Sequence, residues 1–514
     1  VYTKWRENLP ELIQQRMDLV VNSKDIPYNM LDRSTVKHYG AYDIVYTLEV
    51  LLALYDCNPD RNVYAINLEN SLIFPLFEME RVGFNIDKNY LTESAVKMQQ
   101  YIKQKRLELY DLADYPSLTI GQHAVIKQIL NDKFHLNVTT TDKTELSRKH
   151  ADLKLTDPES NAVKFIETLQ ELRTLEKWYT TYIIRFIKDL KYSNRLYTSI
   201  NQVGAVSGRV TSDFQQFPRQ GIKTTTGESL FTPRQMIMVE GGDYPKILYL
   251  DYSQIELRIQ ALYTILVGKP DLNLCRAYMP YKCHNVDGLE FDFTHMTNLN
   301  QNWYLDESPD VLWTPTDIHS ATACAAFNVT PEAPDFKSLR SKGKTLNFAK
   351  NYGAQFGRVK QMFPEYDDAT IKIIDEAYYK TFPGVKLYHD YCYKIALYAQ
   401  AVPNLFGVNY HGVSGHNLIN MLVQGSAATL LKIAIRRIYD YSKAHNIKSK
   451  WQMQIHDELS WIWHKDESEL LQIFKSLMEY WPDFYVPIIA ESEVTIGSWA
   501  NKQEVKNESN CTGN

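Results

Sequence analysis

The sequence lacks the features of a secreted or membrane-spanning protein. Its 514 residues contain only six cysteines, none in CxxC spacing, which indicates neither a disulfide framework nor a zinc knuckle. No apolar run approaches the roughly 20 residues of a membrane span, and the start at Val1 shows no signal peptide. We therefore expect a cytoplasmic protein in a reducing compartment, without a membrane partner. The missing initiator Met favours a fragment, a processed chain or a split gene product.

The chain also lacks an overall positive charge, because its formal net charge is -5. Proteins that bind nucleic acid typically show a basic footprint, so any such surface must be local here. The segment between Asp335 and Glu365 has no acidic residue but many lysines and arginines, and it is the best candidate. A second acid-free stretch, residues 214–227 with Arg219 and Lys223, either meets phosphates or is a flexible loop.

Two short stretches place carboxylates at the ends of predicted strands. Asp251 follows the apolar run 247–250, which is typical of a buried strand, and precedes a segment of helical character. Alternation of polar and apolar residues over 452–463 predicts a half-buried strand that turns at His456 and Asp457 into a second strand. The two aspartates are therefore expected to meet across one sheet.

Asp251 and Asp457 are the kind of ligands that a pair of Mg2+ ions needs. Mg2+ prefers oxygen and usually keeps part of its coordination for water and substrate phosphates. In a two-metal site, ions about 3.5–4 Å apart serve the attacking and the leaving oxygen of a phosphoryl transfer. For either motif taken alone, an aspartate that merely caps a turn is the plainer interpretation.

A third stretch predicts a helix with a one-sided stripe. Arg340, Lys344, Phe348 and Tyr352 recur every four residues, so they share one slowly rotating face that runs from cationic to aromatic. Cations suit a triphosphate, and rings suit a base and sugar. A solvated basic face would explain the cations but not the aromatic end. Gly343 lies inside this predicted helix, where glycine makes the helix about 1 kcal/mol less stable than alanine would.

In this order and spacing the three stretches resemble motifs A, B and C of the family A DNA polymerases, the group of bacterial DNA polymerase I and many phage replicases. Motif A is similar to residues 251–258, motif B to residues 340–353 and motif C to residues 456–458. Weaker matches are Ser207-Gly-Arg209, Asp317-Ile-His319 and the segment with Asn420 and Gln424. The resemblance covers nearly the whole chain.

The resemblance implies a DNA-directed DNA polymerase, a nucleotidyltransferase of DNA replication or repair with two Mg2+ ions. The implied metal ligands are Asp251, Tyr252 and Asp457, and the implied catalytic residues are Asp251, Asp457, Lys344 and Glu458. The implied dNTP contacts are Gln254, Glu256, His319, Arg340, Lys344, Phe348 and Tyr352. The implied DNA contacts are Arg209, Arg258, Asn420, Gln424 and His456, while His416 replaces an arginine of the bacterial pattern.

The implied fold is the α+β right-hand fold, with an antiparallel palm sheet and mostly helical fingers and thumb. The expected parts are an exonuclease remnant (1–58), the thumb with the start of the palm (59–195), the palm with motif A (196–258), the fingers (259–415) and the palm with motif C (416–514). Helical spacing is strong over residues 69–128 and 161–191, and the polar tail after Ala500 is expected to fray. Residues 268–312 are expected to be an insertion in the fingers. Its Cys and His spacing fits no standard zinc site.

Tyr39 and Asp43 resemble the last motif of the family's 3′–5′ exonuclease, but the chain begins after the position of the earlier Asp-x-Glu motif. We expect an incomplete site, or ordinary positions on an amphipathic helix. The implied partners are primer–template DNA, dNTPs and either a processivity factor or a separate amino-terminal exonuclease piece. The implied location is the cytoplasm of a bacterium or a phage-infected host.

Two other functions remain open at this point. A single-subunit RNA polymerase shares the palm and the helix, but it should lack a bulky residue at Glu256, because a 2′-hydroxyl needs that room. A catalytically silent DNA-binding subunit should lack intact carboxylates. The sequence favours a DNA polymerase over both.

Overall fold

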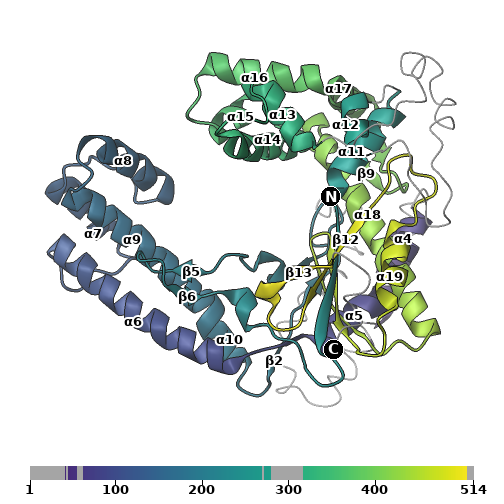
Figure 1. Ribbon diagram of the computed structural model, residues 1–514, viewed down its shortest axis with the longest axis horizontal. Helices are drawn as coiled ribbons and strands as arrows, with labels where there is room; N and C mark the ends of the chain where they lie inside the picture. The colour runs from purple at the N-terminus through teal and green to yellow at the C-terminus, as the bar shows by residue number, and fades with distance from the viewer. Residues whose placement is uncertain (1–40, 42–43, 55–61, 269–270, 279–316, 506–514) are drawn as a thin grey trace. The chain divides into compact units, whose positions relative to one another are not determined.

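The computed structural model describes residues 41, 44–54, 62–268, 271–278 and 317–505 (Figure 1). These residues fall into two compact units, a small one that ends at Asn67 and includes residues 407–409, and a large one with all the rest. In the small unit, Ile44–Leu54 form a helix, as expected for the segment after Asp43. Tyr39 and Asp43 themselves lie outside the described residues, and the expected boundaries of the five parts stay a prediction.

The large unit is built on a five-stranded sheet with the strand order β10-β11-β7-β12-β13. Its strands are β7 (Lys246–Tyr252), β10 (Lys450–Ile455), β11 (Glu458–Trp463), β12 (Ala490–Thr495) and β13 (Gln503–Glu504). Every pairing in it is antiparallel. The strand predicted at residues 247–250 is β7, which lies at the centre of the sheet, and the predicted hairpin is β10–β11.

Both faces of this sheet are covered, which corrects the prediction of a half-buried hairpin. Met453 on β10 belongs to one hydrophobic core, whereas Trp461 on β11 belongs to a second. Helix α5 (Ile73–Val82) packs on β10. The alternation in the sequence came from Gln452 and Gln454, which are nevertheless buried. Polar side chains in this hairpin therefore do not mark a solvent face.

A long helical excursion separates β1 (Phe84–Asn85) from its antiparallel partner β2 (Arg195–Leu196). It contains α6 (Lys88–Ala113), α7 (His123–Gln128), α8 (Lys143–Thr156), α9 (Asn161–Trp178), the π-helical Tyr179–Ile184 and α10 (Arg185–Asp189). Helices α6 and α9 pack side by side (Figure 1). The prediction of helices over residues 69–128 and 161–191 is confirmed for most of both ranges. The exceptions are β1 and the turn between α6 and α7.

A second helical group follows β7. Its members are α11 (Ile255–Leu266), α12 (Leu272–Tyr278), α13 (Ile318–Phe327), α14 (Phe336–Asn351), α15 (Phe356–Met362), α16 (Asp368–Thr381) and α17 (Pro383–Tyr398). Gly343 lies where α14 meets α13, and a Cβ there would be 2.6 Å from the carbonyl oxygen of His319. The glycine therefore permits close helix packing, which offsets its low helix propensity. Most of the expected insertion at 268–312 lies outside the described residues.

Helix α18 (Gly415–Ala444) is long and apolar enough to span a membrane by length and composition alone, and no other helix of the described residues is. However, 83% of its most apolar window is buried inside the protein. Leu422 and Ile435 belong to the second hydrophobic core, and α11 and α17 pack against the helix. Its apolar character is that of a core helix.

The segment after Ala500 is ordered where it was expected to fray. Residues 503–504 form β13 and pair with β12 at the edge of the sheet. Lys502 is largely buried and forms ion pairs with Glu458 and, at 3.2 Å, with Glu493. The attraction between this lysine and two carboxylates holds the segment against the sheet, so the expectation was wrong for Lys502 to Val505.

Candidate active site

Carboxylates gather where β7 ends and the β10–β11 hairpin turns. Asp251 on β7 lies directly opposite Glu458 on β11, so the two side chains share one face of the sheet. Asp457 lies in the hairpin turn, and its carbonyl oxygen accepts a 3.3 Å hydrogen bond from the backbone N–H of Tyr252. His456 has a positive φ of 54° in the same turn. The structure thus brings the two aspartates together across one sheet, as the sequence predicts.

The electrostatics of this cluster are unfavourable for three negative charges. Burial and the charges of Glu458 and Asp457 raise the pKa of Asp251 to about 7. Burial also raises the pKa of Asp457 to about 6, although Arg209 opposes this. Burial raises the pKa of Glu458 despite its ion pair with Lys502. Within the described part of the chain, no lysine or arginine pairs with Asp251.

The donor set fits a divalent cation. Carboxylate oxygens are the ligands that Mg2+ prefers. A cation between Asp251 and Asp457 would offset the burial of both carboxylates and the repulsion that Asp251 experiences from Glu458 and Asp457. The phenol of Tyr252 donates to the carbonyl oxygen of Met478 at 2.9 Å, which leaves its main-chain carbonyl as the possible ligand. Among the described residues, no three or more His, Cys, Asp or Glu side chains are grouped so that they could hold a metal ion by themselves. Water and substrate phosphates would have to complete the coordination.

Arg209 and Glu256 connect the carboxylates to α11 and α14. Arg209 forms an ion pair with Glu256, and its Nη2 lies 3.5 Å from Oδ1 of Asp457. The Nδ2 of Asn351 donates to Oε2 of Glu256 at 3.2 Å. Burial and Glu256, which also hydrogen-bonds the phenol, raise the pKa of Tyr352. Glu256 is only 4% exposed, so these three partners hold its carboxylate in one orientation.

The predicted stripe is present on α14. Arg340 and Lys344 are exposed and Phe348 is half-buried, while Tyr352 lies at the C-cap, one residue past the helix. Arg340 forms an ion pair with Asp317, the N-cap residue of α13. Although burial opposes it, the ion pair with Arg340 helps to lower the pKa of Asp317 to about 2. The cations of the stripe are therefore on a solvent-accessible face.

His319 lies beneath this stripe as a neutral side chain. Burial, together with the charges of Lys344 and Arg340, lowers its pKa to about 4. Its Nδ1 is 3.0 Å from Nδ2 of Asn347, and the amide is oriented because Thr322 donates to its oxygen at 2.8 Å. With the amide in this orientation, Nδ1 accepts a hydrogen bond and Nε2 carries the proton. His319 can donate one hydrogen bond to an anion.

Two residues of motif A have different surroundings. The guanidinium of Arg258 donates to the carbonyl oxygens of Ser253 and Pro487, each at 2.8 Å, and lies 4.7 Å from the ring centroid of Tyr278. Because it is buried, the structure does not support the expected DNA contact of Arg258; the side chain instead holds the start of α11. Gln254 is exposed and accepts a 3.0 Å hydrogen bond from Tyr278.

Asn420 and Gln424 lie one turn apart on α18 and are partly buried. The Oδ1 of Asn420 is shielded from solvent and has no hydrogen-bond partner within the described part of the protein. Gly425 follows Gln424 and lies close to the carbonyl oxygen of Ser207. This contact places the segment before Arg209 beside α18. The charge of Arg219 opposes the rise in the pKa of Asp251, and it adds to burial and Arg209 in lowering the pKa of His456. The second acid-free stretch therefore also lies near the carboxylates.

The sequence profile of DNA polymerase family A matches residues 88–501. The chain belongs to DNA polymerase family A. DNA polymerase I of Caldicellulosiruptor bescii is 27% identical over 461 residues, which cover 86% of this chain and 48% of that protein. DNA polymerase I of Chloroflexus aurantiacus is 26% identical over 509 residues, which cover 95% of this chain and 49% of that protein. The chain spans about half the length of the curated relatives that it matches.

A solved structure described as the POL domain of Pol1 from M. smegmatis, in complex with DNA primer-template and dNTP, is similar to this chain. The TM-score is 0.71 with 21% sequence identity, and the match covers 90% of this chain and 76% of that one. This likeness confirms the expected right-hand polymerase fold.

A cavity of about 700 Å³ lies beside α14 in this family A fold. Its lining includes the rings of Phe348, Tyr352 and Tyr393, together with Arg358 and His416. Flat apolar rings with a few polar groups at the rim suit a planar aromatic ligand, and the volume lies in the range of small-molecule sites. His416, which replaces the arginine of the bacterial pattern, therefore lines a cavity beside motif B.

Sequence reasoning missed several residues of this family A site. Asn347 and Asn351 lie four residues apart on the buried face of α14, and polar residues at helical spacing beside an exposed stripe were a readable signal. No feature of the sequence indicated that Lys502 would be the partner of Glu458. The lysine stands far along the chain, in a segment whose composition resembles a tail.

Proposed function

We propose that this chain catalyses template-directed DNA synthesis, in which a primer 3′-hydroxyl attacks the alpha-phosphate of a dNTP. The observation that carries the proposal is the meeting of Asp251 and Asp457, joined through Arg209 and Glu256 to the cationic and aromatic helix α14. The relatives named DNA polymerase I, and the structural neighbour bound to DNA primer-template and dNTP, support the same substrates here.

The proposed cofactor is a pair of Mg2+ ions held by Asp251, Asp457 and the main-chain carbonyl of Tyr252. When bound, the ions supply Lewis-acid polarisation of the attacking and leaving oxygens. Glu458, paired with Lys502, stays beside the site as a further carboxylate. Most of the catalysis then comes from positioning and charge stabilisation by the protein.

The exposed end of α14 is proposed to bind the triphosphate. Lys344 and Arg340 neutralise its charge, and Nε2 of His319 donates to a phosphate oxygen. Arg340 already pairs with Asp317, so the triphosphate replaces one anionic partner with another. Because of this exchange, Arg340 contributes less to the binding free energy of the triphosphate than Lys344 does.

Sugar and base are proposed to bind at the other end of α14. Glu256 is held by three partners, so it presents a rigid wall that excludes a 2′-hydroxyl, and Gln254 lines the same pocket. Phe348 and Tyr352 stack near the incoming nucleotide. The duplex is proposed to contact Arg209, Asn420, Gln424 and His456, which lie on neighbouring segments around the carboxylates.

A primer-extension assay with the purified chain, Mg2+ and dNTPs tests the proposal. Extension is expected, and chelation of the metal should abolish it. Parallel reactions with ribonucleotides test a single-subunit RNA polymerase, which would use them as readily as deoxyribonucleotides. Tight primer–template binding without any extension would instead support a catalytically silent DNA-binding subunit.

A processivity factor, a separate amino-terminal exonuclease piece and a phage origin stay predictions. The cytoplasm of a bacterium or a phage-infected host is the location that the proposed function implies.

A further inference from the structure

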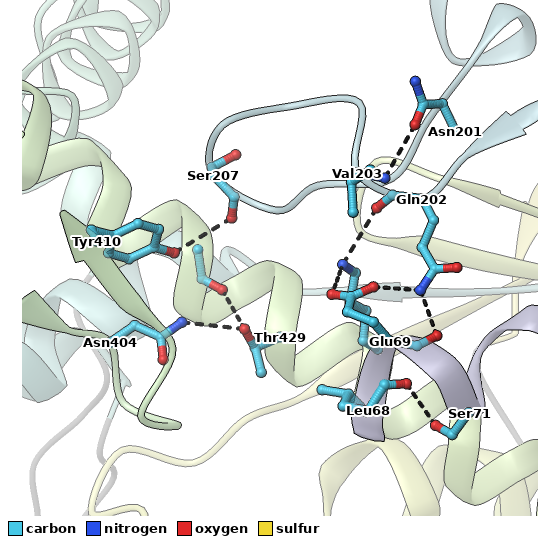
Figure 2. A network of polar contacts seen from close by, with 12 residues as sticks. Leu68, Glu69, Ser71, Asn201, Gln202, Val203, Ser207, Asn404, Tyr410 and Thr429 are labelled. Atoms are coloured by element: carbon cyan, nitrogen blue, oxygen red, sulfur yellow. Dashed lines mark hydrogen bonds and ion pairs between the residues drawn. The ribbon is translucent and has the colours of Figure 1, made fainter. Parts of the chain in front are cut away.

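A hairpin loop carries Arg209 to the site. It joins β3 (Ile200–Asn201) to β4 (Thr211–Ser212), which pair with each other. Arg209 lies near its end and reaches Glu256 and Asp457. Figure 2 shows the polar contacts that hold this loop. The position of the guanidinium therefore depends on how the loop is fixed to the rest of the large unit.

The first anchor of the loop is a partly buried ion pair at its base. Lys432 on α18, whose side chain is only 4% exposed, pairs with Glu69 near the end of α4 (Val63–Ser71). The same ammonium donates to the carbonyl oxygen of Gln202 at 3.4 Å. The side-chain amide of Gln202 donates to the main-chain carbonyl of Glu69 at 2.6 Å and to its carboxylate (Figure 2). Polar contacts therefore connect α4, the base of the loop and α18 to one another.

The second anchor lies just before Arg209. Tyr410 on β9 (Asn409–His411) donates to the carbonyl oxygen of Ser207 at 3.5 Å (Figure 2). Gly425 on α18 makes room for this contact, because a Cβ there would lie 1.6 Å from the tyrosine oxygen. Gly208 has a φ of 82°, a conformation that glycine adopts readily. The backbone therefore turns between the second anchor and the arginine.

Between the two anchors the loop has little to hold it. Val203 and Val206 are 71% and 75% exposed, so these apolar side chains do not contribute a core. The conformation of the loop therefore depends on polar contacts. The ammonium of Lys432 is removed from water, whereas the side chain of Glu69 is 34% exposed. The cost of burying the ammonium offsets part of the attraction to Glu69, which points to a role for Lys432 other than stabilising α18.

We infer that Lys432 and Glu69 are positioning residues that hold Arg209 against Glu256 by fixing Gln202 at the base of the loop. Loss of Lys432 leaves the carbonyl oxygen of Gln202 without its donor and the Glu69 carboxylate without its cation. The loop then gains freedom at the end opposite to the tyrosine anchor. Arg209 then no longer restrains Glu256, and discrimination between ribose and deoxyribose weakens. The inference rests on the proposed function, because sugar discrimination requires nucleotide incorporation.

The test compares Lys432→Met, which removes the charge and keeps most of the volume, with the wild-type chain. Hydrogen exchange of the amides of residues 202–209 should accelerate by about tenfold or more, while β7 and β11 exchange as before. The preference for dNTP over rNTP, as a ratio of kcat/KM values, should fall by about fivefold or more. A change of overall stability alone would not move this ratio.

Three further variants separate positioning from folding. Lys432→Arg keeps the charge and the donors and should retain the wild-type preference. Gln202→Ala detaches the loop without leaving a buried charge, so it should reproduce both effects even if Lys432→Met does not fold. Lys443→Met removes an exposed ion pair between α18 and Glu78 of α5, which does not involve the loop, and should change neither readout.

Two results would overturn the inference. One is unchanged exchange of residues 202–209 in Gln202→Ala, and the other is faster exchange with an unchanged sugar preference. A wild-type chain that extends no primer would overturn the proposed function instead. The exchange measurement would then still decide whether the anchor holds the loop.

Discussion

Asp251 and Glu458 face each other across two neighbouring antiparallel strands, in a sheet that is covered on both faces. Glu491 lies opposite Asp251 on the other side. Lys502 offsets the charge of Glu458, whereas no described cation pairs with Asp251, whose pKa is raised to about 7. Such an arrangement works against the stability of the folded chain, and the proposed binding of Mg2+ would offset it.

The first prediction concerns Asp251→Asn. The variant should lose at least about a thousandfold in extension rate, which corresponds to about 4 kcal/mol of transition-state stabilisation. Its thermal unfolding temperature should stay equal or rise, because one member of a repelling cluster becomes neutral. Asp243→Asn is the control, since Asp243 is exposed and pairs with Lys465. Extension at a near wild-type rate by Asp251→Asn would contradict the site assignment.

Removal of the carboxylate from α11 should relax sugar selection. In Glu256→Ala, a ribonucleotide gains room at the 2′ position, and incorporation of rNTP relative to dNTP should rise by about tenfold or more. Competition assays measure this ratio directly. Glu240→Ala removes another partly buried glutamate, which pairs with Arg195 and Lys450, and should leave the ratio unchanged. An unchanged ratio in Glu256→Ala would assign the discrimination to another residue.

Two glycines in helices should respond in opposite directions to alanine. Gly343→Ala should destabilise the chain, because the new Cβ would meet the His319 carbonyl oxygen at 2.6 Å and the backbone N of Ala323 at 3.1 Å. Gly357→Ala in α15 has nothing within 4 Å, so it should stabilise by up to about 1 kcal/mol through helix propensity. Thermal unfolding of both variants checks this. Equal shifts of the same sign would contradict the close approach of α13 and α14.

A buried histidine should make stability depend on pH. Burial and the charge of Lys350 lower the pKa of His389 from 6.5 to about 3. The folded chain keeps this side chain neutral, whereas the unfolded chain protonates it. The free energy of unfolding is therefore unaffected by the protonation of this histidine above about pH 6.5. It decreases as the pH falls from 6.5 towards 3, by up to about 1.4 kcal/mol per pH unit.

Urea unfolding between pH 7 and pH 5 measures this dependence. In His389→Phe, the unfolding midpoint should fall less steeply with decreasing pH than in the wild type. Tyr379→Phe removes the hydroxyl that lies 3.2 Å from Nδ1 of His389 but keeps the titrating group, so it should retain the wild-type slope. Parallel slopes in His389→Phe and the wild type would refute the assignment.

Local structure could be predicted because it depends on short-range patterns. Successive side chains of a strand point to opposite faces, so the short unbroken run of apolar residues before Asp251 predicts a strand that is covered on both faces. A repeat of four residues from Arg340 to Tyr352 is enough to predict one face of a helix. The order and spacing of three such motifs then indicated the family. Where a pattern was ambiguous, as for buried Gln452 and Gln454, the prediction of exposure was wrong.

The sequence by itself therefore determined which elements form, which residue types they carry and to which family the chain is similar. Only the tertiary structure decided which residues become partners. Lys502 neutralises Glu458, Asn351 orients Glu256 and Arg258 is turned into the protein. The physical reason is that burial, pKa and ion pairing depend on side chains from distant segments, and their approach is set by packing of whole helices and strands.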